Sequence, residues 1–140
     1  MYETGWRIAF PGDSTGEEGS GAPDVTERVD KPWGYEIIWA KTERYVGKVL
    51  HIEAGEALSL QYHKVKEETI RLQSGKLILE VEEPGQSRRK IVMSPGDSFH
   101  LRPGTIHRMI AEETSDVLEV STPELDDVVR LEDRYGRAGR

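Results

Sequence analysis

The 140-residue sequence contains no cysteine, which excludes disulfide bridges and thiolate metal ligands. It also lacks any run of about 20 apolar residues, the length that a membrane-spanning helix requires. Its first residues show no basic region followed by an apolar run, so a signal peptide is not expected. We therefore expect a cytoplasmic protein that has no membrane partner.

An excess of basic side chains is also absent. Lysine and arginine together number 19 against 26 acidic residues, which gives a formal net charge of −7. Proteins whose main partner is a nucleic acid usually present a basic face, so we expect no nucleic-acid partner. The charge balance still allows a local basic pocket for a single phosphate group.

The N-terminal residues differ in composition from the rest of the chain. Residues 1–28 are rich in glycine, serine, proline and acids, as in PGDSTGEEGSGAPD, and offer few apolar side chains to bury. We predict a flexible extension over 1–28 and a single domain over 29–140, a size that can bury a core of its own. The more apolar GWRIAF near the start is a candidate docking strand for that domain or for a second subunit.

Short segments rich in β-branched and aromatic residues recur about every ten residues from position 31 on, and Pro-Gly pairs separate several of them. This spacing predicts an all-β fold, which we expect to be an antiparallel barrel of six to ten strands in jelly-roll order. Open sheet edges invite pairing, so we also expect a homodimer. PELDDVVRLEDRYGR, with Pro123 near its start and Gly136 near its end, predicts a short C-terminal helical segment.

Four polar residues are spaced like the ligands of a metal site. Gln61 and His63 alternate along a predicted strand, so their side chains point to the same face. A charged turn follows, and Glu68 would return on the next strand to face the same cavity. His107 comes from a distant strand, just after a Pro-Gly turn. Imidazole and carboxylate ligands suit one divalent ion such as Zn, Mn, Fe, Co or Ni, although a single buried histidine is more often an ordinary core residue.

The glycines around these residues have the spacing of the two cupin motifs. The matching residues are Gly55, Gln61, His63, Glu68 and Gly75 in the first motif and Gly96, Gly104 and His107 in the second. Gln61 stands where the first motif has its first histidine, and Ala111 stands where the second usually ends in asparagine. From about residue 31 to 137 the chain resembles a single-domain cupin, which implies a double-stranded β-helix, or jelly-roll barrel.

Three segments, KPWGYE, LSLQYH and VVRLEDRYGR, resemble the C-terminal cupin domain of type II mannose-6-phosphate isomerases. The resemblance implies that the four residues named above hold one divalent metal, that Arg137 contacts the substrate, and that Lys48 matches a lysine of the family. It implies a metal-dependent enzyme that interconverts an aldose and a ketose, with a sugar or sugar phosphate as its small-molecule substrate. The chain departs from the family after His63, where Lys64 and Val65 replace two histidines.

The expected catalytic residues are Glu68, Lys48 and Arg137. Glu68 is the natural carboxylate for moving a proton, but a carboxylate bound to a metal is a weak base. Lys48, an unliganded acid or a hydroxide on the metal is therefore an alternative base. Other functions stay open at this point: another metal-dependent reaction (dioxygenase, lyase or epimerase), a non-catalytic sugar-binding module, and a structural cupin with a vacant site.

Overall fold

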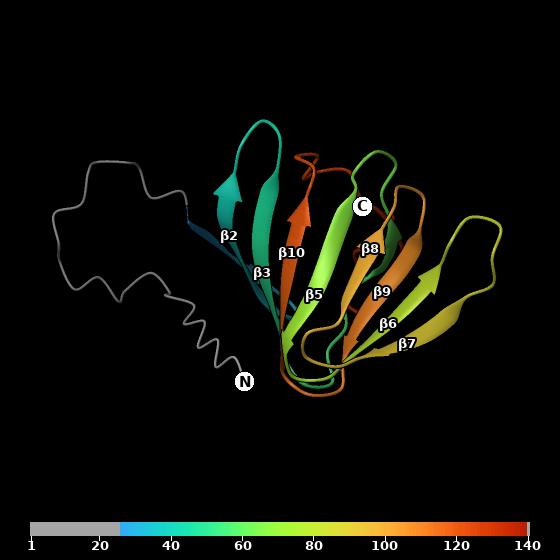
Figure 1. Ribbon diagram of the computed structural model, residues 1–140. Coiled ribbons are helices and arrows are strands. Elements are labelled where there is room, and N and C mark those ends of the chain that lie inside the picture. Colours follow the sequence, from blue (N-terminus) through green and yellow to red (C-terminus); the bar gives the residue numbers. More distant parts are fainter. Residues whose placement is uncertain (1–25, 140) are drawn as a thin grey trace, which may run out of the picture.

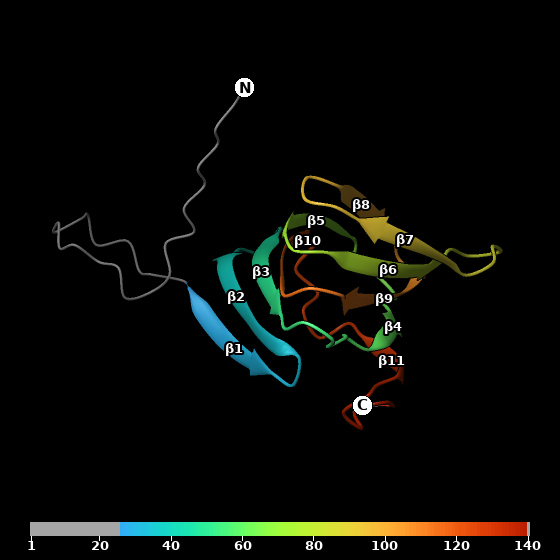
Figure 2. The same ribbon diagram turned by 90° about the horizontal axis from the view of Figure 1, so that it is seen from below.

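The computed structural model describes residues 26–139, which form eleven β-strands in two antiparallel sheets (Figures 1 and 2). The strands are β1 (Glu27–Lys31), β2 (Gly34–Lys41), β3 (Val46–Ile52), β4 (Leu60–Tyr62), β5 (Glu68–Ser74), β6 (Leu77–Glu82), β7 (Arg89–Met93), β8 (Ser98–Leu101), β9 (Ile106–Ala111), β10 (Ser115–Ser121) and β11 (Val129–Glu132). One sheet has the order β1-β2-β3-β10-β5-β8, and the other has the order β11-β4-β9-β6-β7. The two sheets wrap around a common interior, which confirms the predicted all-β jelly roll.

The interior is apolar at one end of the barrel and polar at the other. Side chains alternate across a strand, so every second residue points inward. In β10 the buried residues change from Val117 to Glu119 and Ser121 along the strand. The same change occurs in β3 (Leu50 to Lys48), β5 (Ile70 to Glu68) and β9 (Met109 to His107). Burying polar groups is costly unless they find partners, so the polar end marks a candidate functional site.

The apolar end supplies the stability that supports this polar end. Its members include Ile52, Leu72, Leu77, Leu79 and Val117, none of which has measurable exposure. Full burial of each such side chain contributes about 1.5–3 kcal/mol relative to exposure. The turn between β5 and β6 closes this end at Gly75, whose φ is 93°. A Cβ there would lie 2.4 Å from the Thr114 carbonyl oxygen, so the turn requires glycine.

The predicted C-terminal helical segment is wrong. Residues 123–128 form turns, in which the Leu125 N–H donates to the Pro123 carbonyl and the Asp127 N–H donates to that of Glu124. The chain then extends as β11 and pairs with β4, with Arg130 opposite Gln61. The edge of β4 offers backbone partners to an extended chain, and two consecutive valines suit a strand better than a helix. The described residues contain no helix.

Three further expectations concern the extent of the domain. The strand count is eleven, one more than the expected maximum of ten. The predicted division at residue 28 falls within β1, which pairs with β2 at the edge of its sheet. The candidate docking strand GWRIAF lies outside the described residues. Within 26–139, the structure has no helix with the length and apolarity that a membrane span needs.

Candidate metal centre

Three buried side chains from separate segments meet at the polar end of the barrel. His63 follows β4, Glu68 begins β5 and His107 lies in β9. The Glu68 Oε1 atom lies 3.4 Å from His63 Nε2 and 3.2 Å from His107 Nε2. One donor atom of each residue lies within 4.8 Å of the others, and the three side chains are at most 6% exposed.

The donor atoms fit one divalent ion. The buried atoms His63 Nε2, His107 Nε2 and both Glu68 carboxylate oxygens have no hydrogen bond of acceptable geometry. Buried polar atoms without partners are rare and costly. Nitrogen and oxygen ligands bind such ions at about 2.0–2.2 Å, which places neighbouring ligand atoms about 3.0–3.5 Å apart. The two separations from Glu68 Oε1, 3.4 and 3.2 Å, fall in this range. Two imidazoles with a carboxylate suit Zn, Mn, Fe, Co or Ni.

Backbone carbonyls orient both imidazoles toward this point. His63 Nδ1 donates to the Asp127 carbonyl oxygen at 2.5 Å, and His107 Nδ1 donates to that of Thr105 at 2.9 Å. A carbonyl can only accept, so each Nδ1 carries a proton, and Nε2 is the ring atom that remains to bind a metal ion. This arrangement is the one that supports a histidine ligand from outside the first coordination sphere.

The third ligand residue is held in its ionised form. Burial by itself would raise the pKa of the Glu68 carboxyl, but the close His107 and His63 imidazoles and the charge of Lys66 hold that pKa well below its ordinary value. The Lys66 ammonium lies 3.1 Å from Glu68 Oε2, which leaves Oε1 directed at the two histidines. Glu68 is therefore an anionic ligand at neutral pH.

A second carboxyl lies behind the first. Glu119 Oε2 lies 3.4 Å from the Lys66 ammonium, and both side chains are 6% exposed. Burial, together with the negative charge of Glu68, raises the pKa of Glu119 to about 7. Burial lowers the pKa of Lys66, but the Glu119 and Glu68 carboxylates outweigh it and raise that pKa above its ordinary value. The centre therefore includes a carboxyl that titrates near neutral pH.

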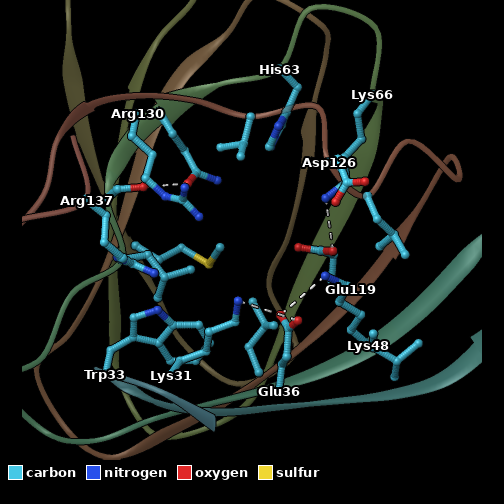
Figure 3. Close-up of a pocket in the computed structure, with 18 of the residues that line it drawn as sticks. Lys31, Trp33, Glu36, Lys48, His63, Lys66, Glu119, Asp126, Arg130 and Arg137 are labelled. Carbon is cyan, nitrogen blue, oxygen red and sulfur yellow. Dashed lines mark hydrogen bonds and ion pairs between the residues drawn. The ribbon is translucent and has the colours of Figure 1, made fainter. Parts of the chain in front are cut away.

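His63 also forms part of the wall of a cavity of about 280 Å³ (Figure 3). Figure 3 shows Arg130 and Arg137 on one side of the cavity and Lys48 and Glu119 on the other. Six cationic and four anionic side chains line the cavity. The cationic ones are Lys31, Lys41, Lys48, Lys66, Arg130 and Arg137, and the anionic ones are Glu27, Glu36, Glu119 and Asp126. The cavity therefore has a cationic surplus, although the chain as a whole is acidic.

A family model described as "Cupin domain" matches residues 48–122, more than half of the chain. The chain belongs to the cupin family. This match covers all four residues predicted as metal ligands and the strands that carry them. No protein of curated function matches the cupin in sequence.

Solved structures of other proteins share the fold of this cupin. KdgF from Halomonas sp. is 24% identical with a TM-score of 0.63, over 71% of this chain and 90% of that one. Oxalate decarboxylase from Bacillus subtilis is 14% identical with a TM-score of 0.67, over 76% of this chain and 30% of that one. The capsular polysaccharide assembling protein CapF from Staphylococcus aureus is 17% identical with a TM-score of 0.64, over 77% and 34%. The cupin thus spans about a third of the last two proteins, and identities this low indicate the fold alone.

The structure shows where the predicted metal ligands lie. His63, Glu68 and His107 come together as described, which is consistent with one metal ion. Gln61 lies opposite His107 in the β4–β9 pair and lines the cavity, where its amide oxygen accepts a hydrogen bond from the Ser59 hydroxyl at 2.6 Å. The role of Gln61 as a fourth ligand stays a prediction.

The two predicted catalytic cations also line the cavity, and each has an acidic partner. The Lys48 ammonium lies 3.3 Å from Glu36 Oε2. The Arg137 guanidinium donates two hydrogen bonds to the Asp133 carboxylate, at 2.9 and 3.0 Å. These contacts fix both cations at the cavity wall, and their roles in catalysis stay predictions.

Sequence reasoning missed three of the residues that surround the centre: Glu36, Lys66 and Glu119. For Glu119 a signal was present, because it alternates with Val117 and Ser121 and so shares their inward face. Lys66 lies in a charged run that is typical of an exposed turn, and its burial depends on contacts with distant segments. Strand alternation could have found Glu119, whereas Lys66 has no comparable signal.

Proposed function

We propose that this cupin is a metal-dependent isomerase that interconverts the aldose and ketose forms of a small sugar or sugar phosphate. The observation that carries the proposal is the joining of the His63–Glu68–His107 centre to a cavity lined by buried ionisable groups. The resemblance of the sequence to type II mannose-6-phosphate isomerases selects this reaction among those that such a centre can support.

His63, Glu68 and His107 would hold the metal, with Gln61 as a further candidate ligand. A divalent ion bound there would supply a Lewis acid for the carbonyl of an open-chain sugar. The Asp127 and Thr105 carbonyls keep the imidazole donors aimed at that position. The contribution of the chain is therefore a fixed, largely dehydrated set of donors.

The reaction also requires a group that takes a proton from one carbon and returns it to the next. Glu119 suits this task because it lines the cavity, is not one of the ligands, and has a pKa of about 7. A general base is most effective when its pKa lies near the working pH. Lys48 lies opposite Glu119 in the β3–β10 register and supplies a positive charge beside it. We assign the proton transfer to Glu119 and the positioning of a substrate oxygen to Lys48.

The other side of the cavity suits an anionic group of the substrate. Arginine side chains match phosphate and carboxylate oxygens through paired N–H groups. Arg137 lines the cavity and is braced by Asp133, so little side-chain freedom remains to be lost when it binds. The cationic surplus of the cavity supports the same assignment.

The experiment is to incubate metal-loaded protein with mannose 6-phosphate and, separately, fructose 6-phosphate in D₂O. Proton NMR should show exchange of the C2 proton of mannose 6-phosphate, exchange of a C1 proton of fructose 6-phosphate, and interconversion of the two sugars. Glu119→Gln should lower the rate about 10²–10⁴-fold, the usual contribution of a general base. Glu112→Gln is the matched control, because Glu112 is exposed and its carboxylate pairs with the surface residue Lys76. Absence of exchange with both sugars would remove this substrate pair.

One observation favours a second candidate function. The described centre supplies two histidines and one carboxylate, the ligand set of non-haem Fe(II) oxygenases. Oxygen uptake by the Fe(II)-loaded protein with phenols or thiols, without exchange of a sugar proton, would select a dioxygenase over the isomerase. Binding of sugar without turnover would select a non-catalytic module, and protein that takes up no metal would select a structural cupin.

A further inference from the structure

One residue outside the ligand set binds the loop that carries His63 in two ways. The Asp127 carbonyl oxygen accepts the His63 Nδ1 proton at 2.5 Å. Its carboxylate accepts the backbone N–H groups of Lys64, Val65 and Lys66, at 3.0, 2.7 and 2.8 Å. Asp127 is 64 residues from His63 in the sequence, so these four hydrogen bonds join two distant segments.

We propose that Asp127 is a positioning residue that sets the affinity of the centre for its metal by fixing the His63 imidazole. The proposal rests on the metal site of the proposed function, although it does not depend on which reaction the site performs. It assigns to the C-terminal segment before β11 a role in metal binding.

The two histidines differ in how they are supported. His107 lies within β9, and its imidazole bonds to the carbonyl of Thr105, two residues earlier in the same segment. His63 lies just after β4, where the strand has ended, and its imidazole bonds to a carbonyl of a segment built of turns. Its own backbone carbonyl accepts a hydrogen bond from the Gly104 N–H at 2.7 Å, which fixes the main chain but not the ring. The orientation of the His63 ring therefore depends on where the Asp127 carbonyl lies.

The Asp127 carboxylate determines that position. The carbonyl of Asp127 belongs to the backbone, so no substitution removes it. The three hydrogen bonds from backbone N–H groups to the Asp127 side chain hold this carbonyl against the loop. Together with the imidazole bond they close a compact ring between residues 63–66 and Asp127. Loss of the carboxylate would let the segment shift, and the His63 ring would then sample both tautomers and several rotamers. Each added conformation lowers the fraction of protein that is ready to bind metal.

The test compares three single variants in the full chain. Asp127→Ala removes all three side-chain hydrogen bonds, whereas Asp127→Asn retains an oxygen that can accept two of them. Asp97→Ala is the matched control, because the Asp97 carboxylate also accepts a backbone N–H, from Ser94 at 2.9 Å, but contacts none of the ligand residues. Zn²⁺ affinity is measured by competition with a chromogenic chelator, and the His63 tautomer by imidazole ¹⁵N NMR of the metal-free protein.

Loss of a group that supports a ligand typically costs about 10–100-fold in metal affinity. We expect a loss of about that size for Asp127→Ala, a smaller loss for Asp127→Asn and none for Asp97→Ala. In the NMR spectrum, His63 should change from a single Nδ1–H tautomer to a mixture in Asp127→Ala, and His107 should not change. A general loss of stability would not alter one histidine alone.

The proposal is overturned if folded Asp127→Ala protein binds Zn²⁺ as tightly as the wild type, or if Asp97→Ala loses as much affinity. Should Asp127→Ala not fold, Asp127→Asn decides: wild-type affinity with a single His63 tautomer overturns the proposal. A His63→Ala variant distinguishes an error in the metal site from an error in the role assigned to Asp127. If this variant keeps wild-type Zn²⁺ affinity, the metal site itself is wrong. If it loses Zn²⁺ while Asp127→Ala does not, only the role of Asp127 is rejected.

Discussion

Replacement of Lys66 by methionine tests whether the buried charges around the metal centre stabilise one another. The Lys66 ammonium lies between two buried carboxyls, 3.1 Å from Glu68 and 3.4 Å from Glu119. Methionine has a similar length and no charge, so the substitution leaves two buried acids side by side. Removal of one partner from a buried ion pair costs about 3–5 kcal/mol, because it leaves a charge without compensation. All three side chains are at most 6% exposed, so solvent screens this effect little.

For a domain of this size, 1 kcal/mol corresponds to about 3 °C in Tm, so the metal-free Lys66→Met protein should melt about 10–15 °C below the wild type. A saturating divalent metal should restore most of this loss, because the ion supplies positive charge beside Glu68. The measurements are Tm by circular dichroism at pH 8, with chelator and with Zn²⁺. Lys76→Met is the control, because Lys76 pairs with Glu112 on the surface, where solvent screens the ion pair and its loss should change the Tm little. A metal-free Lys66→Met protein that melts within about 2 °C of the wild type would contradict this mutual stabilisation of the buried charges.

Metal binding, the titration of Glu119 and self-association can each be measured separately. Zn²⁺ at 100 times its Kd should stabilise the wild type by about 2.7 kcal/mol, or about 8 °C in Tm, and should leave the double variant His63→Ala/His107→Ala unchanged in a thermal-shift assay. Burial raises the pKa of Glu119 from 4.5 to about 7, so its stabilising protonated form is lost as the pH rises through 7. The Tm of metal-free wild type should therefore fall between pH 5 and 8, and Glu119→Gln should remove that part of the fall. Light scattering should give twice the chain mass of 15.8 kDa, because exposed Trp39 and Val120 offer an apolar surface to a second copy, and Trp39→Ser should yield monomer.

Much of the fold could be predicted because its signals are local. Strand alternation, Pro-Gly turns and motif glycines such as Gly75 each reflect a constraint on a few neighbouring residues. The C-terminal segment shows where such signals fail. Pro123 and the acids that follow it suit the start of a helix, but Val129–Glu132 pairs with β4 instead. The choice between helix and strand was decided by a distant sheet edge, which no local pattern contains.

The candidate site also contains some residues that local sequence signals reveal and others that they do not. His63, Glu68 and His107 could be found because the spacing of ligands on strands is regular and their chemistry is specific. Lys66 could not, because a lysine in a charged run is almost always solvated and only the three-dimensional packing shows it to be buried. Asp127 could not be found for a similar reason, since its partners lie more than 60 residues away.

The charges of the buried residues around the centre bear on the order in which ligands bind. Besides the two histidines, five buried acids and lysines surround the cavity and the centre: Glu36, Glu68 and Glu119, and Lys48 and Lys66. With all of them ionised, the set carries one negative charge. Burial, together with the charge of Glu68, raises the pKa of Glu119 to about 7, so the set is fully ionised only above neutral pH. A divalent ion reverses the sign and leaves the set with one positive charge. The metal-free cavity therefore opposes an anionic ligand at its inner end, and the metal-loaded cavity attracts one. Metal should bind first and an anionic sugar second, so the affinity of the protein for a sugar phosphate should depend on the metal more strongly than its affinity for the neutral sugar.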